Sequence, residues 1–262
     1  MPTNETLHNA KVGKNNTFYT LLDDVETELC HYSDKFRNKT VLCNCDDSNS
    51  AFWEYFHTHF TELGLKKLIA THYDTTYPTY ARLYEGGNDS IIESCDTKQL
   101  TGNGDFRSDE CLDFLEEADI VVTNPPFTMF KEMMALLMHF QKQFLIIGSM
   151  NALSYKEIFP LFRDNKVWYG VSIHSGDRKF YVPNSYPLNA SGCGIDPTNG
   201  KRFIKVKGVR WFTNLDHQFK HKPLALSKRY APEDYPLYDN FDAININSYK
   251  DIPCDYDGVM GV

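Results

Sequence analysis

The sequence predicts an α/β fold: a twisted, mostly parallel sheet with helices on both faces, completed by a C-terminal, loop-rich and partly antiparallel region. Between Thr40 and Met150, short apolar runs alternate with stretches of helical periodicity, a pattern typical of βαβ units. After about Arg163, strand-like runs are separated by segments rich in Gly, Pro, Asn and Ser. We therefore expect a core at residues 1–162 and a second part at residues 163–262 that completes the sheet.

Each element of the core follows from a local pattern. Apolar runs predict strands at residues 39–45, 67–71, 119–123 and 143–147. Apolar residues three or four positions apart predict helices at residues 51–63, 109–118 and 131–140, the first of them stopped by Gly64. Residues 80–93 predict a hairpin between the second and third of these strands.

The second part is less regular. Strand-like runs occupy residues 167–172 and 206–212, and the segment between them, residues 183–200, reads as a long functional loop. Beyond Lys222, recurring prolines predict irregular chain.

Charge is distributed unevenly along the chain. The formal net charge is −8, but residues 163–230 hold 13 Lys and Arg against 4 Asp and Glu. Basic segments attract polyanions because they release counterions from phosphate backbones. The segment predicts either a nucleic-acid partner or a solvated basic face without one.

Composition excludes several classes of protein. No apolar run approaches the roughly 20 residues of a membrane-spanning helix, and the polar N-terminus lacks the apolar core of a signal peptide. The seven cysteines are scattered and include no C-x-x-C pair, so we expect neither a disulfide scaffold nor a metal site. These features predict a cytoplasmic protein.

The strongest chemical signal is the tetrapeptide formed by Asn124, Pro125, Pro126 and Phe127, at the carboxyl end of a predicted buried strand. Ligands of open α/β sheets bind at such ends. The prolines rigidify the loop and remove two N–H donors, which leaves backbone carbonyls and the Asn124 amide oxygen as acceptors. Acceptors beside the aromatic ring of Phe127 suit a planar ring that bears an NH₂ group.

This tetrapeptide resembles motif IV of S-adenosylmethionine-dependent amino-methyltransferases. Phe18-Tyr19-Thr20 resembles their motif X, Gly104-Asp105-Phe106 resembles motif III, and residues 43–47 stand where motif I belongs. These four segments, together with residues 209–215, resemble the EcoRI-type adenine-specific DNA methyltransferases of bacteria and phages. The chain ends at residues 258–262 where these relatives continue, so we expect a short C-terminal element to be missing.

The resemblance implies methyl transfer from S-adenosylmethionine to N6 of an adenine flipped out of double-stranded DNA. It assigns catalysis to the tetrapeptide at 124–127. It places the following residues at the cofactor: Phe18, Tyr19, Thr20, Asn44, Cys45, Asp46, Thr71, Asp105, Phe106 and Asn124. Residues 1–162 then form the cofactor-binding catalytic core, and residues 163–262 recognise DNA. We assign DNA contacts to Arg178, Lys179, Lys201, Arg202, Lys205, Lys207 and Arg210.

Two features depart from most methyltransferases. Motif I lacks glycine, and Asp46 fits a simple helix cap as well as a cofactor contact. The acidic residue usual after the second strand is absent, because Thr71 and His72 occupy that place. The ribose-binding residue is therefore unassigned.

Other readings of the sequence stay open. Acceptors of the same kind serve methyltransferases that act on an RNA base or on a protein glutamine amide. The third reading is a DNA-binding module without turnover, which the glycine-free motif I favours and the intact tetrapeptide opposes. We expect a monomer or a weak dimer, in the host cytosol if a phage encodes the protein.

Overall fold

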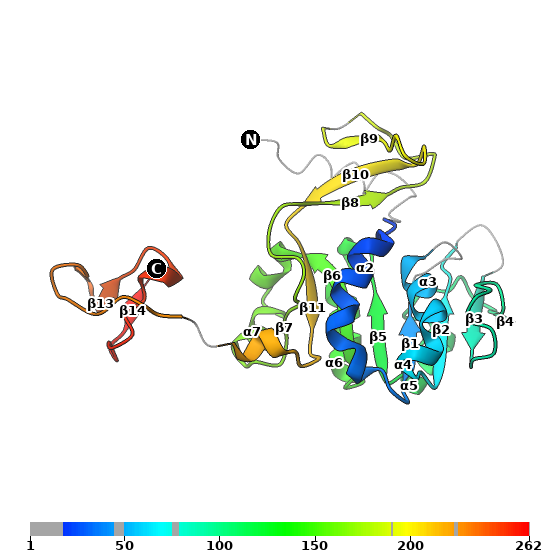
Figure 1. Ribbon diagram of the computed structural model, residues 1–262, viewed down its shortest axis with the longest axis horizontal. Helices are drawn as coiled ribbons and strands as arrows, with labels where there is room; N and C mark the ends of the chain where they lie inside the picture. The colour runs from blue at the N-terminus through cyan, green and yellow to red at the C-terminus, as the bar shows by residue number, and fades with distance from the viewer. Residues whose placement is uncertain (1–17, 45–49, 75–78, 190, 223–224, 262) are drawn as a thin grey trace. The chain divides into compact units, whose positions relative to one another are not determined.

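The parallel core predicted from the sequence is present. The computed structural model describes residues 18–44, 50–74, 79–189, 191–222 and 225–261. Within them, an eight-stranded sheet has the order β4-β3-β2-β1-β5-β6-β11-β7 (Figure 1). The four middle strands are parallel: β2 (Lys67–Thr71), β1 (Thr40–Cys43), β5 (Ile120–Thr123) and β6 (Gln143–Ser149). Antiparallel pairs complete both sides, with β3 (Tyr80–Tyr84) and β4 (Asp96–Gln99) on one, and β11 (Val209–Thr213) and β7 (Trp168–Tyr169) on the other.

Helices cover both faces of this sheet, as predicted. One face packs against α2 (Leu22–Leu29), η1 (Cys30–Lys35), α3 (Ala51–Thr58) and α4 (Phe60–Leu63). The other packs against α5 (Asp109–Glu117), α6 (Phe130–His139) and α7 (Phe159–Arg163). Short 3-10 turns lie at η2 (Phe127–Met129), η3 (Met150–Ser154), η4 (Gln218–His221) and η5 (Tyr249–Asp251).

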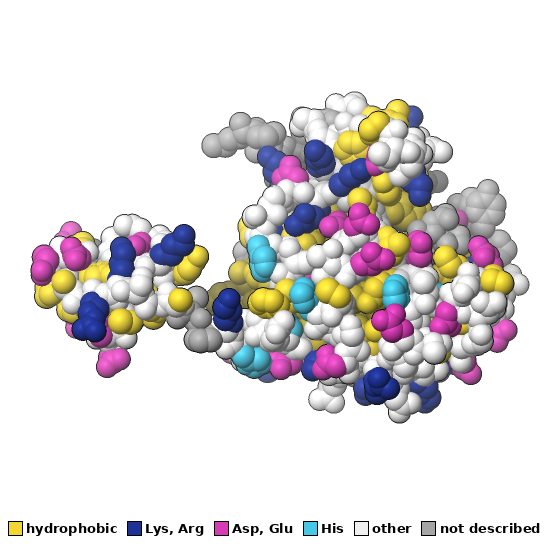
Figure 2. All heavy atoms as spheres, in the orientation of Figure 1, with side chains coloured by type: hydrophobic (Ala, Val, Ile, Leu, Met, Phe, Trp, Pro, Cys, Tyr) yellow, Lys and Arg dark blue, Asp and Glu magenta, His cyan; other side chains and the backbone are white. Residues whose placement is uncertain are grey.

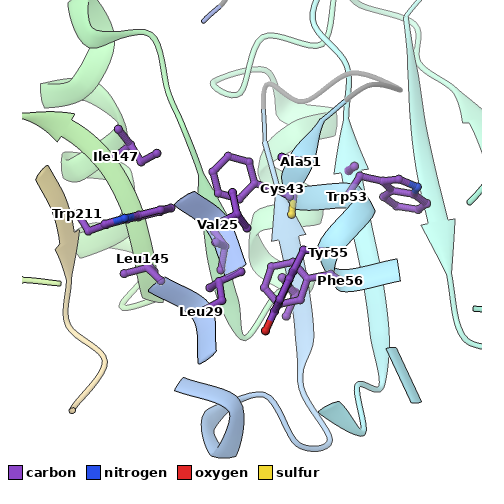
Figure 3. Close-up of a cluster of buried hydrophobic side chains, with 14 of the residues drawn as sticks. Val25, Leu29, Cys43, Ala51, Trp53, Tyr55, Phe56, Leu145, Ile147 and Trp211 are labelled. Atoms are coloured by element: carbon purple, nitrogen blue, oxygen red, sulfur yellow. The ribbon is translucent and has the colours of Figure 1, made fainter. Parts of the chain in front are cut away.

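Alternation along the strands divides the core into two apolar clusters. On β6, Leu145 and Ile147 face one cluster, whereas Phe144 and Ile146 face the other. Figure 3 shows part of the first cluster, where Val25 and Leu29 of α2 lie among side chains from β1, β6, α3 and β11. Because both faces are buried, the middle strands are apolar except near their ends.

A second, smaller sheet follows β7 in the chain. It is antiparallel, with the order β8-β10-β9, and comprises β8 (Asp177–Tyr181), β9 (Cys193–Ile195) and β10 (Arg202–Lys207). Its inner face, which includes Phe180 and Ile204, belongs to the first apolar cluster. Its outer face presents Lys205 and Lys207 to solvent.

Several element predictions are confirmed, and others are wrong. The predicted strand at 167–172 is only the two-residue β7, the predicted loop at 183–200 contains β9, and the chain beyond Lys222 holds a small sheet. Strand β2 has the predicted bounds, and Gly64 ends α4 in the left-handed conformation at φ +64°. The predicted helix at 51–63 is interrupted at His59, and the partner of β3 in the hairpin is β4 rather than residues 91–93. The predicted strand at 206–212 is two strands, β10 and β11, which Gly208 separates at φ +67°.

The chain divides into two compact units, Met1–His217 and Gln218–Val262. The second unit holds β12 (Leu237–Tyr238), β13 (Phe241–Asn245) and β14 (Met260–Gly261) around a small core. The boundary expected at 162/163 falls inside the first unit, because β11 and β7 belong to the large sheet. The functional division at that point remains a prediction. No helix in the described ranges is long and apolar enough to cross a membrane.

Candidate active site

The candidate site residues gather at one edge of the large sheet. Asn44, Thr71 and Asn124 stand at the carboxyl ends of β1, β2 and β5, which are adjacent. Strand β4 runs in the direction of β2, because both are antiparallel to β3, so the loop after β4 reaches the same edge. That loop carries Asp105. The edge is the one at which open α/β sheets bind their ligands.

The carboxamide of Asn124 is held in one orientation. Its Nδ2 donates to the main-chain oxygen of Phe18 at 2.8 Å and to Oγ1 of Thr20 at 3.3 Å. Because a main-chain carbonyl only accepts, the nitrogen side of the amide must face Phe18. The oxygen Oδ1 is thereby turned to the other side, and no described residue donates a hydrogen bond to it.

The two prolines leave one further acceptor. The carbonyl of Pro126 accepts from the N–H of Met129 at 2.8 Å. The carbonyl of Pro125 receives no hydrogen bond from any residue that the structure describes. Asn124 Oδ1 and the Pro125 carbonyl are therefore two acceptors that this loop can offer to a ligand.

Phe127 is half-buried at the start of η2 and packs edge-on against two other rings. Its ring centroid lies 6.0 Å from that of Phe18 and 6.4 Å from that of Phe180, with interplanar angles of 73° and 85°. Edge-to-face packing of this kind is favourable and fixes the ring plane. The partly exposed ring can therefore serve as a platform for a flat ligand.

The segment Phe18–Thr20 is joined to the small sheet as well as to Asn124. Tyr19 and Tyr181 form an antiparallel bridge, with main-chain N–H···O distances of 2.9 Å in both directions. Since β8 is an edge strand of its sheet, Tyr19 pairs beside it as a bridge of a single residue. The segment thus connects the small sheet to the loop that carries Asn124.

The end of β1 carries a buried acceptor. Asn44 is 1% exposed, its Oδ1 is buried without a hydrogen-bond partner, and its main-chain oxygen accepts from Oγ1 of Thr123. This last contact ties the ends of β1 and β5 together. Thr71, at the end of β2, is fully buried. Cys45 and Asp46, the other predicted cofactor residues of this region, lie outside the described residues.

The loop after β4 packs tightly against the end of β2. Gly104 has φ +71°, and a Cβ there would overlap the main-chain oxygen of His72. The next residue, Asp105, is paired with Arg107, whose hydrogen bonds hold the pKa of the carboxyl below its ordinary value. The ring of Phe106 is 3% exposed and belongs to the second apolar cluster. Of the two residues of this loop that were predicted to bind the cofactor, Asp105 is therefore the one whose side chain lies at this edge of the large sheet.

The seven basic residues predicted to bind DNA differ in their surroundings. Three are engaged within the protein: Lys179 with Asp196, Arg202 with the carbonyl of Tyr186, and Arg210 with the carbonyls of Val209 and His174. Lys201, Lys205 and Lys207 are exposed. Figure 2 shows basic side chains gathered over β8 and β10, above a surface with more acidic groups. Arg178 faces the opposite side of β8, where its Nε is buried without a partner.

The family described as "Adenine-specific methyltransferase EcoRI" matches residues 6–262. The chain is 44% identical to the type II methyltransferase M.EcoRI of Escherichia coli, over 99% of this chain and 84% of that protein. It is 40% identical to the type II methyltransferase M.MgeORF184P of Mycoplasma genitalium, over 97% of this chain and 79% of that protein. No solved structure matches it.

The chain belongs to the EcoRI family of adenine-specific methyltransferases. The family predicted from the motifs is therefore confirmed, and so is the prediction of an enzyme. The match spans both compact units of the methyltransferase.

One residue of this methyltransferase that sequence analysis missed is Glu28. It is fully buried on α2 and accepts hydrogen bonds from Tyr32 Oη at 2.9 Å and from the N–H groups of Val171 and Ser172 at 2.7 and 2.6 Å. It thereby anchors α2 to the chain that leads into β8. The signal was its spacing, since Val25, Glu28, Leu29 and Tyr32 form one buried stripe that runs from α2 into η1.

Proposed function

We propose that this methyltransferase transfers the methyl group of S-adenosylmethionine to the N6 amino group of an adenine within a specific DNA sequence. The observation that carries the proposal is the fixed carboxamide of Asn124, whose nitrogen is bound by Phe18 and Thr20. An acceptor pair made of Asn124 Oδ1 and the Pro125 carbonyl suits an amino group on a planar ring.

The two acceptors act on the nitrogen that is methylated. The N6 hydrogens of the adenine would donate to Asn124 Oδ1 and to the Pro125 carbonyl. These bonds hold the amino group so that its lone pair points toward the methyl donor, and they strengthen as positive charge develops on nitrogen. Phe127 would stack on the target base. Alignment of donor and acceptor supplies the rest of the rate enhancement.

Residues at the same edge fit the cofactor. S-adenosylmethionine supplies a methyl group already activated by its sulfonium charge. The buried, unpartnered Oδ1 of Asn44 is an acceptor for a hydroxyl or ammonium group of this cofactor. The Asp105 carboxylate retains lone pairs beyond those that Arg107 uses, and would accept from the adenine amino group of the cofactor.

DNA binding falls to the part of the chain after residue 162. A base inside a duplex must be flipped out before its amino group can reach the Asn124 loop. Lys201, Lys205 and Lys207 would hold phosphates, and the remaining loops of residues 163–262 would read flanking bases.

The test is transfer of a labelled methyl group from S-adenosylmethionine to unmethylated duplex DNA, followed by digestion to nucleosides. We expect label in N6-methyladenine, and at least roughly tenfold slower labelling with the Asn124→Ala variant at matched protein concentration. Label found only in RNA or in protein would mean that adenine in DNA is not the acceptor. Cofactor binding with no transfer to any of the three acceptors would indicate a DNA-binding module without turnover.

A further inference from the structure

The acceptor oxygen of Asn124 faces a ligand only if its amide nitrogen stays bound on the other side. An asparagine side chain alone has two amide orientations, related by rotation about χ2, which exchange oxygen and nitrogen. In the reversed orientation, Nδ2 would face the target amino group, and one donor would oppose another. Whatever fixes this rotation is therefore part of the catalytic apparatus.

Two groups in the segment Phe18–Thr20 fix it: the main-chain oxygen of Phe18 and the hydroxyl of Thr20. Thr20 is 7% exposed, so water has little access with which to replace a lost hydroxyl. The segment is itself immobilised, since Tyr19 is bridged to Tyr181 and the ring of Phe18 packs on Phe127, Phe180 and Tyr186.

We infer that Thr20 is a positioning residue that acts through Asn124: its hydroxyl, with the Phe18 carbonyl, holds the catalytic carboxamide with its oxygen toward the target amino group. The inference rests on the proposed function and adds a role for Thr20 beyond the cofactor contact that motif X implies. The orientation of the Asn124 amide would then also depend on β8, because the bridge between Tyr19 and Tyr181 holds this segment in place.

The test is a double-mutant cycle on the full chain, read as the single-turnover rate of methyl transfer at saturating cofactor and DNA. Thr20→Val keeps the shape of the side chain and removes the hydroxyl. We expect it to slow transfer about three- to tenfold, the loss of one modest hydrogen bond. In the Asn124→Ala background the same change should have less than about a twofold effect, because no amide remains to be positioned.

Two further readouts separate positioning from packing and from cofactor binding. Thr20→Ser and Thr20→Ala both remove the methyl group, but only the serine keeps the hydroxyl, so transfer should stay near the wild-type rate in Thr20→Ser and fall in Thr20→Ala. The slowing in Thr20→Val should persist as the concentration of S-adenosylmethionine is raised further, because an effect on cofactor affinity alone disappears at saturation.

The inference is overturned by an equal slowing in both Asn124 backgrounds, by equal losses in Thr20→Ser and Thr20→Ala, or by a Thr20→Val rate that returns to the wild-type value as the cofactor concentration is raised. The wild-type enzyme, run in the same assay, tests the proposed function separately. If it methylates a different acceptor, the proposed function fails, and the cycle still measures whether Thr20 acts through Asn124.

Discussion

Arg107 holds the carboxylate of Asp105 with two parallel hydrogen bonds, from Nε to Oδ1 at 2.9 Å and from Nη2 to Oδ2 at 2.6 Å. The N–H of Arg107 also donates to Oδ1 at 2.9 Å. A bidentate pair of this kind fixes both the charge and the plane of the carboxylate. The carboxylate is therefore a preorganised acceptor at the edge of the sheet.

From this arrangement we predict that Asp105→Ala weakens the binding of S-adenosylmethionine and leaves the single-turnover rate at saturating cofactor near that of the wild type. Calorimetry would measure the affinity. Asp113→Ala is the matched control, because Asp113 is an exposed acid on the next helix, α5. An unchanged affinity for S-adenosylmethionine in Asp105→Ala would show that Asp105 does not bind the cofactor.

The close packing of Gly104 leads to a second prediction. A side chain at this position would need φ +71° and would overlap the oxygen of His72, so the loop must shift. We expect Gly104→Ala to lower both the melting temperature and the cofactor affinity. Gly102→Ala is the control, because its Cβ would meet only Glu110 Oε2 at an ordinary 3.6 Å. Equal effects of the two variants would contradict a special role for Gly104.

The way in which each strand is buried determines whether it could be predicted from the sequence. Strands β1, β2, β5 and β6 lie between two helical layers, so each has a continuous apolar run that is easily recognised. Strand β4 was missed because all four of its residues are exposed, and no alternation marks it. Strand β9 was missed because it lies within a Gly- and Pro-rich segment that reads as a loop.

The site was predictable to a similar extent. Asn124 and its prolines are adjacent in the chain, and their chemistry can be read locally. The orientation of the amide depends on Phe18 and Thr20, which are 106 and 104 residues away in sequence. The ion pair between Lys179 and Asp196 likewise joins residues that are 17 positions apart in the sequence, so composition alone could not separate the exposed basic residues from those engaged within the protein.

The distinction between exposed and engaged basic residues supports a third prediction, on the salt dependence of DNA binding. Neutralising Lys201, Lys205 and Lys207 with glutamine should reduce the slope of log affinity for DNA against log salt, by roughly 0.9 for each phosphate that is no longer neutralised. Binding titrations at several salt concentrations would measure it. Lys66→Gln is the control, since Lys66 is exposed at the opposite edge of the sheet, just before β2. An unchanged slope in the triple variant would place the DNA elsewhere.

A fourth prediction concerns Asp196, which is 4% exposed. It accepts from Lys179, Tyr181 and Thr198, and these bonds hold the pKa of its carboxyl well below the ordinary 3.8. A depressed pKa stabilises the fold at pH values above 3.8, and this contribution is lost as pH falls through the lower folded-state pKa. We expect Asp196→Asn to lower the melting temperature near neutral pH.

The acid range provides the check on that assignment. As pH falls from about 4 toward the lower folded-state pKa, the gap between the melting temperatures of the wild type and of Asp196→Asn should narrow, because the carboxyl is protonated first in the unfolded chain and only at the lower pKa in the folded protein. Thermal unfolding of both proteins across the range would measure the difference. A gap that stays constant down to the lowest pH would mean that the ionised carboxylate contributes nothing.

The last prediction concerns Asn124 itself. Asn124→Ala should lower the single-turnover rate at least roughly tenfold, because the variant lacks a hydrogen bond that strengthens in the transition state, while cofactor binding persists. Asn124→Asp separates the acceptor from its orientation: it retains an oxygen toward the target, but it has no donor for the Phe18 carbonyl and would set two acceptors against each other. We therefore expect the aspartate to be slow as well. A near-normal rate in the aspartate alone would show that an oxygen suffices without the bond to Phe18, and a near-normal rate in both variants would remove Asn124 from catalysis.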